Sequence, residues 1–575
     1  MNCPSRVDET LDHVGWNQNP SALAPDATTR QDMIGLANLK SQRDHKIGYD
    51  GAIEHTWSPE DEIERETQRT GSRNADSFPS KDAKGGGSTA ASTEHVSSHR
   101  QAPIMLQALV VTRAFFRKGY QVLSKYARFV GPGFMVAVAY IDPGNYATDV
   151  AAGAAFRFRL LFIILMSNVF AIFLQSLCIK LGTVTGLNLA EHCRAHLPKW
   201  LNLTLYLFAE AAIIATDIAE VIGSAIALNL LLKIPLVAGC AITLVDVLVI
   251  LIFYNPAGSI RGLRAFECFV IVFVLGVVVC FCIQLSLIED TSVGEVFKGY
   301  LPSSTVVQSE GLYLSCGILG ATVMPHSLYL GSGIVQSRLR HYDSELPEAS
   351  NMFSDDADDC PKYRPSLTAI RYCLKYSIAE LAISLFTFAL FVNSSILIVA
   401  GASLSNKADA RDADLFAIHS LLSRSLAPAA GTVFALALLF SGTSAGIVCT
   451  IAGQMVSEGA LNWTVAPWVR RLITRAISIT PSIIIAGAVG REGLSAALNG
   501  SQVALSVILP FVSAPLIYFT CRNRYMTVTT SDGDASGTCV KMRNHWITAV
   551  LAVLIWLVIV IMNVALLVLV GLGKA

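Results

Sequence analysis

The sequence contains little charge, and its charges balance. Only 15% of the 575 residues are Asp, Glu, Lys or Arg, and the formal net charge is zero. Binding to nucleic acid depends on a surplus of positive charge, so no nucleic-acid partner is expected. The 13 cysteines include no Cys-x-x-Cys pair, which argues against both a zinc cluster and a disulfide framework. Because a nucleophile–base pattern and a phosphate-binding loop are also missing, we expect neither an enzyme nor a bound cofactor.

Apolar residues, in contrast, are abundant. They make up 53% of the chain, and the mean hydropathy is +0.51, values typical of a polytopic membrane protein embedded in a lipid bilayer. Long apolar runs predict eleven transmembrane helices, of which the sixth and eighth are too long for one simple crossing. The predicted spans are 128–153, 156–182, 202–232, 236–254, 264–288, 308–337, 367–402, 414–460, 469–490, 496–520 and 545–572.

The polar segments predict the orientation of the chain. Residues 1–103 are polar and show no apolar period, which predicts a disordered tail ahead of a transmembrane domain at 104–575. A cluster of Lys and Arg within 104–128 precedes the first span, and most other loop cations lie in loops on the same side. The positive-inside rule therefore predicts a cytosolic N-terminus. The choice between the plasma membrane and an endosomal or vacuolar membrane stays open.

A charge, a helix breaker and an amide interrupt the first predicted span. The tetrapeptide Asp142-Pro143-Gly144-Asn145 lies inside an otherwise apolar run. A carboxylate is costly in the bilayer interior, Pro removes a backbone donor, and Gly allows the chain to turn. A helix broken at membrane depth frees carbonyls and side chains that can hold an ion. The pattern therefore predicts part of an ion-binding site.

A second break is predicted in the sixth span, at Met324-Pro325-His326. Five spans separate the two breaks, and five spans reverse the direction of crossing. The pattern therefore predicts inverted repeats at about 128–288 and 308–520, followed by an extra helix at about 545–572. Interrupted helices at matching positions of two halves are typical of a transporter site at the midplane. The alternative is a pair of proline kinks in passive helices.

The side chains at the two breaks indicate which cations would bind. Asp142 offers a hard anionic oxygen, Asn145 a neutral oxygen and Met324 a soft sulfur. Mg²⁺ and Ca²⁺ prefer oxygen ligands alone, whereas a thioether favours softer transition-metal divalents. Methionine also fills gaps in apolar cores, so its sulfur indicates a metal only in combination with the broken helices.

The third span carries three carboxylates: Glu210, Asp217 and Glu220. At about 100° per residue, their spacing places all three on one helix face. Three such groups in a membrane helix should not all be ionised without partners. They form either a chain that passes protons or a static ion-pair network that holds helices together. His326 is likewise either a proton carrier or a core histidine that fixes helix packing.

Three other carboxylates lie inside predicted spans: Asp246, Glu267 and Glu380. Each has a polar or basic residue nearby; Arg264, for example, lies one turn from Glu267. We therefore predict structural pairing for all three.

The sequence resembles the Nramp (natural resistance-associated macrophage protein) family of divalent metal transporters, and most of all its fungal manganese and iron members. The strongest marks are the Asp-Pro-Gly-Asn run at 142–145 and the Met-Pro-His run at 324–326, with further matches at 215–220, 452–454 and 501–506. The resemblance implies an all-α LeuT-type fold with five-plus-five inverted repeats and discontinuous first and sixth helices. It also implies proton-coupled import of Mn²⁺ or Fe²⁺, and of Cd²⁺ or Co²⁺, towards the cytosol by alternating access.

Carried over residue by residue, the resemblance implies a ligand set and a proton pathway. The implied metal ligands are Asp142, Asn145, Met324, the backbone carbonyls of Ala139 and Ala321 in different conformations, and Gln502 in some states. The implied proton pathway comprises His326, Asp217, Glu220 and Glu210, with Arg470, Arg471 and Arg338 as basic partners.

Three further positions show where the sequence matches or departs from the family pattern. Asn393 matches a polar position in the seventh span and is either a gate residue or part of a helix-to-helix hydrogen bond. Ser327 stands where many family members have Asn, and Gly331 stands where many have a second His. A proton role assigned to that second His cannot be carried over to this chain.

Two other functions are alternatives to metal transport. A metal sensor or receptor that kept the fold without transport would be suggested by loss of Asp142 or Met324, and both are present. A sodium-coupled organic solute carrier would need a pocket for a carboxylate or amine, whereas these ligands suit a bare cation. Mn²⁺ and Fe²⁺ suit the same ligand set, so the choice between them stays open. We expect a monomer that has protons and a divalent metal ion as its partners.

Overall fold

The protein is described here from a computed structural model of the 575-residue chain. The structure describes residues 131–254, 260–289, 291–345, 363–405, 414–462, 467–488, 490–529 and 539–573. All of them belong to one compact unit, Ala108–Ala575. The predicted tail at 1–103 lies outside the described residues, as do the acidic part of the loop at 346–362 and the basic cluster before the first span.

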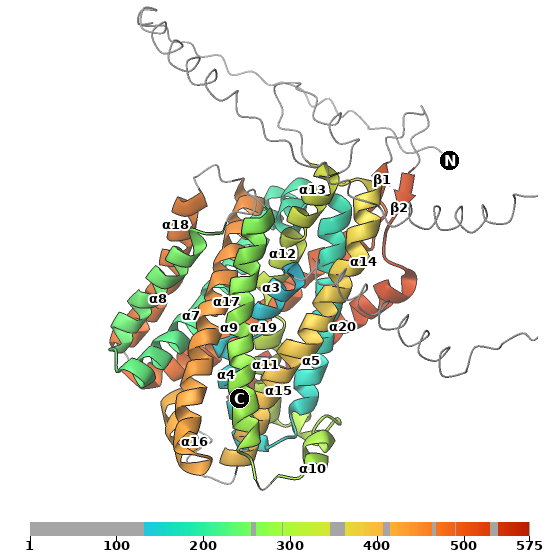
Figure 1. Cartoon of the computed structure of the whole chain (residues 1–575). Helices are drawn as coiled ribbons and strands as arrows, with labels where there is room; N and C mark the ends of the chain where they lie inside the picture. Colours follow the sequence, from blue (N-terminus) through green and yellow to red (C-terminus); the bar gives the residue numbers. More distant parts are fainter. Residues whose placement is uncertain are drawn as a thin grey trace, which may run out of the picture. The chain divides into compact units, whose positions relative to one another are not determined.

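The described chain is almost entirely helical (Figure 1). The first half comprises α3 Pro132–Ala139, α4 Pro143–Phe156, α5 Leu161–Thr185, α6 Leu189–His196, α7 Lys199–Leu232, α8 Leu236–Leu251, α9 Ile260–Ser286, α10 Val293–Lys298 and the short η1 Ser304–Val307. The second half comprises α11 Ser309–Thr322, α12 Pro325–Ile334, α13 Gln336–Ser344, α14 Leu367–Ser384, η3 Leu385–Ala389, α15 Leu390–Leu404, α16 Leu415–Ser425, α17 Pro428–Leu461, α18 Pro467–Ala488, α19 Gly490–Thr520 and α20 Trp546–Gly571.

These helices match the eleven predicted spans. Eight helical segments are long and apolar enough to cross a membrane, two shorter apolar helices add to them, and the interrupted pair α3 and α4 forms the first span. The predicted eighth span is two helices, α16 and α17, which explains its excess length. The sixth continues into α13. The prediction of an integral membrane protein is confirmed.

Both predicted helix breaks are present. α3 ends at Ala139 and α4 begins at Pro143, while α11 ends at Thr322 and α12 begins at Pro325. Proline suits the first position of a helix because its missing N–H would have no intrahelical partner there. The same residue type therefore ends one helix and starts the next at each break.

The broken helices lie at the centre of the bundle. α4 packs against α11, α15 and α19, and α12 packs against α5 and α17. Most residues of α3, α4, α11 and α12 are buried, whereas α9 and α20 expose many apolar side chains. In Figure 1, α9 lies against α15 and α17. The apolar outer surface suits contact with lipid, and the polar residues of the breaks are kept away from it.

A two-stranded hairpin was not predicted. Strand β1 (Thr527–Thr529) pairs antiparallel with β2 (Cys539–Lys541), so that Val528 faces Val540. Cys539 is disulfide-bonded, whereas the cysteine spacing did not predict a disulfide framework. Ten other cysteines in the described part of the chain are free.

Candidate functional site

The first break places Asp142 at the N-terminus of α4. Its carboxylate accepts hydrogen bonds from the backbone N–H groups of Gly144 (3.2 Å) and Asn145 (3.1 Å). It also accepts one from the side-chain amide of Asn145 (2.6 Å). The first N–H groups of a helix have no partners within the helix, and the positive end of the helix dipole favours an anion. The backbone of α4 therefore stabilises a carboxylate that is fully buried.

Each break also leaves one backbone carbonyl without its helical donor. In an α-helix the carbonyl of residue i accepts from the N–H of residue i+4, and proline has no N–H. Ala139 lies four residues before Pro143, and Ala321 lies four residues before Pro325. The two carbonyls that the resemblance implies as ligands are therefore those that the prolines make available.

A direct hydrogen bond joins the two breaks. The side-chain amide of Asn145 donates to the carbonyl oxygen of Ala321 (3.3 Å) as well as to Asp142. The other side-chain atom of Asn145, Oδ1, is buried and has no hydrogen-bond partner among the described residues. Met324 caps α12 three residues after Ala321 and is fully buried. Carboxylate, amide and carbonyl groups thus meet where the two interrupted helices approach each other, and Met324 occupies the N-cap of α12 at the second break.

Gln502 of α19 approaches the first break. A Cβ atom at Gly144 would lie only 2.3 Å from Gln502 Nε2, so only glycine permits this approach. Gln502 is fully buried, and its Oε1 has no hydrogen-bond partner within the described ranges. A buried carbonyl-type oxygen without a donor is costly, and a cation at the break would satisfy it. Asn393 also lies at this break, where its amide donates to the Tyr140 carbonyl (3.2 Å).

A polar connection leads from the second break to α7. His326, the second residue of α12, lies 3.2 Å from the Thr216 hydroxyl, measured from Nδ1 to Oγ1. Thr216 directly precedes Asp217 in α7. The His326 side chain therefore contacts the residue next to one of the α7 carboxylates. Both His326 and Thr216 are buried. The arrangement supplies adjacent groups that can hold or pass a proton.

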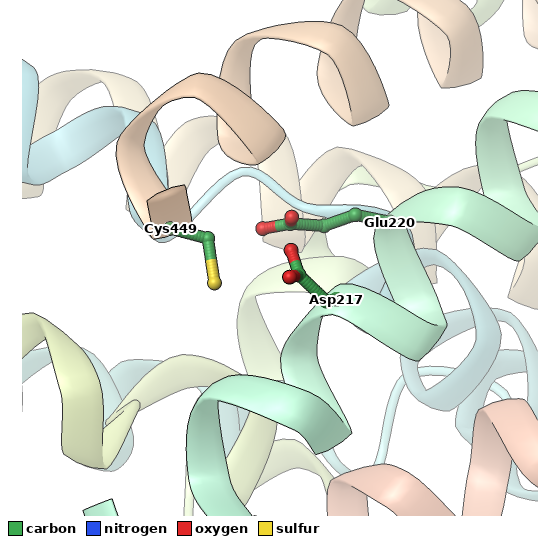
Figure 2. A group of neighbouring side chains, drawn as sticks. All are labelled: Asp217, Glu220 and Cys449. Carbon is green, nitrogen blue, oxygen red and sulfur yellow. The ribbon is translucent and has the colours of Figure 1, made fainter. Parts of the chain in front are cut away.

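The carboxylates of α7 face an arginine of α18. Asp217 forms an ion pair with Arg475, and Arg475 Nη1 lies 3.6 Å from Glu220 Oε2. Asp217 and Glu220 also point toward Cys449 of α17 (Figure 2), and ligand atoms of these three residues lie within 4.8 Å of one another. Two carboxylates and a thiol could hold a metal, but the guanidinium already supplies the positive charge. We therefore interpret this group as a buried ion-pair network.

Comparison with known protein families adds the deciding observation. Residues 133–569 match the family described as natural resistance-associated macrophage protein-like. The chain belongs to the Nramp family. Its curated Nramp relatives include the manganese transporter SMF1 of Saccharomyces cerevisiae, 53% identical over 77% of this chain and 85% of that protein. The iron transporter SMF3 of the same yeast is 55% identical over 72% of this chain and 86% of that protein.

A solved Nramp structure has the same fold. The crystal structure of the Eremococcus coleocola manganese transporter, in complex with an aromatic bis-isothiourea substituted compound, superposes with a TM-score of 0.63 at 32% identity. The match covers 77% of this chain and 87% of the bacterial one. Together with the two interrupted helices, it confirms the predicted all-α fold class with discontinuous first and sixth helices.

The described basic partners in this Nramp chain are Arg338 and Arg475. Arg338 Nη2 donates to Glu267 of α9 at 2.8 Å, whereas the prediction placed Arg338 with the carboxylates of α7. The side chains of Arg470 and Arg471 lie outside the described residues, and the described partner of Asp217 is Arg475. Glu210 keeps one buried oxygen without a hydrogen-bond partner in the described part of the chain.

Structural pairing is confirmed for two of the three remaining carboxylates. Glu267 pairs with Arg338, and Glu380 accepts hydrogen bonds from the backbone N–H groups of Gly131 (2.6 Å) and Phe134 (3.3 Å). Glu380 therefore satisfies the free N–H groups at the start of α3 from a different helix. Asp246 accepts from the N–H of Val247 at 2.6 Å.

One polar network beside the breaks was not predicted. Gln175 of α5 donates to Tyr140 (2.9 Å) and to Ser327 (2.8 Å), and the Ser327 hydroxyl donates to the Met324 carbonyl (2.7 Å). A Cβ at Gly331 would lie 2.0 Å from Gln175 Oε1. The glycine that replaces the second His of many family members thus makes room for Gln175. The amide of Gln175 within the apolar helix α5 was the available sequence signal.

Replacing Gly144 with Ala is expected to weaken Mn²⁺ binding by about tenfold while leaving the fold intact. The new methyl group would displace the end of the Gln502 side chain, which is flexible, whereas the backbone of α4 accepts Ala readily. Loss of one ligand interaction of about 1.4 kcal/mol corresponds to tenfold in affinity. Titration calorimetry on purified protein measures it.

The matched control is Gly500→Ala in α19, because nothing lies within 4 Å of a Cβ at that position. This variant should bind Mn²⁺ with wild-type affinity. Equal affinities of the Gly144 and Gly500 variants would contradict the role of Gln502.

Proposed function

We propose that the protein transports divalent transition-metal ions across a membrane and that the ion binds between the two helix breaks. The observation that carries the proposal is the Asn145 amide, which donates to the Asp142 carboxylate of one break and to the Ala321 carbonyl of the other. One side chain thus brings the ligands of both breaks to one point. The ligands are Asp142, Asn145, Met324, the Ala139 and Ala321 carbonyls, and Gln502.

The chemistry of this set supports a transition metal as the substrate. One carboxylate and several neutral oxygens suit a divalent cation, and the Met324 sulfur favours softer ions over Mg²⁺ and Ca²⁺. The matched relatives are named for manganese, iron and divalent metal cations. We infer that Mn²⁺ and Fe²⁺ are substrates and that Cd²⁺ and Co²⁺ follow the same route.

The placement of the breaks supports alternating access. Each break separates two short helices that can move relative to the rest of the bundle, and both meet at the proposed site. Asp142 is fully buried in this structure. The ion would therefore enter in one conformation and leave towards the cytosol in another, with Asn393 holding the first break closed through the Tyr140 carbonyl.

We propose that the polar side chains between the metal site and α7 couple metal transport to protons. Metal binding at Asp142 requires its ionised form, so a proton that the carboxyl carries must leave when the metal arrives. The nearest chain of groups is His326, Thr216 and Asp217, followed by Arg475 and Glu220. Arg475 can pair with one of the two carboxylates while the other carries the proton, so that no buried charge is left uncompensated. We infer that protons move along α7 towards the cytosolic side, with Glu210 as the carboxylate of α7 nearest to that side.

Uptake of radioactive Mn²⁺ into proteoliposomes tests the function. An inward proton gradient of one pH unit is worth about 1.4 kcal/mol per proton, so it should raise Mn²⁺ accumulation about tenfold per coupled proton. In Asp217→Asn the gradient should no longer stimulate uptake, while the Kd for Mn²⁺ stays within about threefold of wild type because the sites are separate.

The matched control is Glu295→Gln, which removes an exposed carboxylate that pairs with Arg157 far from α7. It should retain full stimulation by the gradient. Wild-type uptake that ignores the gradient would refute proton coupling, and the complete absence of Mn²⁺ uptake would refute transport itself.

A further inference from the structure

The cap of helix α3 comes from another helix. Gly131 stands at its N-cap position and has no side chain that could accept from the free N–H groups. Glu380 of α14 supplies the acceptor instead: its Oε1 accepts from the N–H of Gly131 (2.6 Å) and from that of Phe134 (3.3 Å). An Asp, Asn, Ser or Thr at the N-cap would do this locally. The start of α3 is therefore capped in this way only while α3 lies against α14.

Close packing joins the same end of α3 to α14 (Figure 1). A Cβ at Gly133 would lie 2.7 Å from the backbone nitrogen of Leu381, so only glycine lets α3 approach the α14 backbone this closely. The ring centroids of Phe134 and Phe388 are 4.8 Å apart. Phe388 belongs to η3, the π-helical segment that continues α14, and such segments are frequent at functional sites. A polar, a backbone and an aromatic contact thus hold α3 on one helix.

The second broken helix reaches the same point. α13 follows α12, and its Arg338 pairs with Glu267 of α9 at 2.8 Å. A Cβ at Gly131 would overlap Glu267 Oε2 and would lie 2.5 Å from Arg338 Nη2. Gly131 also has a φ of +153°, a conformation that residues with a side chain rarely adopt. The start of α3 therefore lies directly against an ion pair to which the second broken helix contributes.

On the proposed orientation, these contacts lie on the cytosolic side of the metal site. α3 is the part of the first span before its break, and α12 and α13 follow the break in the sixth. These segments would thus lie between Asp142 and the cytosol. Asp142 is fully buried, so the arrangement corresponds to a closed cytosolic side with α3 held on α14.

We propose that Glu380 is a positioning residue for transport, which holds α3 on α14 while the cytosolic side is closed and releases it when the metal leaves. We call the two hydrogen bonds from Gly131 and Phe134 to Glu380 the α3 latch. The inference rests on the proposed transport function. Because the acceptor belongs to another helix, movement of α3 away from α14 breaks both bonds at once, and water then satisfies the freed groups. Each transport cycle must restore the latch before the outer side opens.

Hydrogen exchange of the full-length protein in detergent, followed by mass spectrometry, tests the latch without transport. Glu380→Ala removes both hydrogen bonds, so peptides within 131–139 should exchange about tenfold faster, equivalent to about 1.4 kcal/mol, while α17 exchanges as in the wild type. Glu380→Gln keeps an oxygen that can accept from the same N–H groups and should exchange like the wild type. The matched control is Ser366→Ala, which removes the N-cap of α14 itself and should leave exchange in 131–139 unchanged.

Initial rates of ⁵⁴Mn²⁺ uptake into proteoliposomes test the role of the latch in transport. Without it, closure of the cytosolic side is less favourable, so Vmax per folded protein should fall about tenfold in Glu380→Ala. KM should not rise, because the proposed ligands are unchanged, and Glu380→Gln should keep the wild-type Vmax. Gly133→Ala separates α3 from the α14 backbone without touching a polar group, and it should also lower Vmax and speed exchange in 131–139. Gly500→Ala, at a position with open space, should do neither.

Faster exchange confined to 131–139 together with a lower Vmax, both absent in Glu380→Gln, would support the latch. An unchanged Vmax in Glu380→Ala, or equally faster exchange in α3 and α17, would leave Glu380 with structural packing alone and overturn the proposal. Equal losses in Glu380→Gln and Glu380→Ala would also overturn it, because the hydrogen bonds would then not be the cause. If Glu380→Ala fails to fold, Gly133→Ala decides. If the wild-type protein takes up no metal, the proposed function fails and the transport role of Glu380 fails with it, whereas the exchange rates still report whether Glu380 holds α3.

Discussion

Replacing Asp142 with Asn is expected to abolish metal uptake. The substitution removes the one anionic ligand of the proposed site and leaves only neutral oxygens and a sulfur for a divalent ion. In a buried site that loss should weaken Mn²⁺ binding by at least about 100-fold, equivalent to about 2.7 kcal/mol. Titration calorimetry and ⁵⁴Mn²⁺ uptake by the same purified protein measure the two effects.

Comparison with Asp142→Ala distinguishes the effect of losing the negative charge from the effect of losing the N-cap hydrogen bonds of α4. Asn is as good an N-cap as Asp, and its one carbonyl oxygen can still accept from one of the two N–H groups, Gly144 or Asn145, that bond to separate oxygens of Asp142. Ala cannot accept those bonds and should lower stability by about 1 kcal/mol more. We expect both variants to lose uptake and only the Ala variant to unfold at a lower temperature. Normal uptake by Asp142→Asn would refute the ligand assignment.

Local sequence signals were sufficient to locate the two breaks. Pro143 and Pro325 each interrupt a long apolar run, and the effect of proline on a helix depends on its immediate neighbours. The helix ends fall at those prolines in the structure. The ligand types could also be read directly, because Asp142 and Met324 directly precede the prolines and cap the helices that follow.

Partners that come from distant helices could not be read in the same way. Arg470, Arg471 and Arg475 all lie in α18, and sequence alone does not show which of them turns toward α7 at the depth of Asp217. Glu267 has Arg264 one turn away on its own helix, yet its described ion-pair partner is Arg338 from α13. A fully buried carboxylate depends on the geometry of its partner more than on nearness in sequence.

Replacing Met324 with Leu is expected to change which ions are transported. Leucine preserves the buried volume approximately, so the fold should lose less than about 1.5 kcal/mol, but it removes the soft ligand. The KM for Mn²⁺ and, more strongly, for Cd²⁺ should rise about tenfold, because the site then offers oxygen ligands alone. Ca²⁺ should compete more effectively with Mn²⁺, since an all-oxygen site suits it better. Competition assays with ⁵⁴Mn²⁺ and ¹⁰⁹Cd²⁺ in proteoliposomes measure these changes.

Met135→Leu is the matched control, because Met135 is also buried in the first span but lies in α3, away from the break. It should transport Mn²⁺ and exclude Ca²⁺ as the wild type does. If Ca²⁺ exclusion is equally strong in wild type and in Met324→Leu, the sulfur does not set selectivity. Discrimination would then have to come from the size of the site between Asp142 and Ala321. In that case both Met324→Leu and the larger Met324→Phe should retain the ion preference while differing in Vmax, whereas a ligand role for the sulfur predicts the same loss of preference in both.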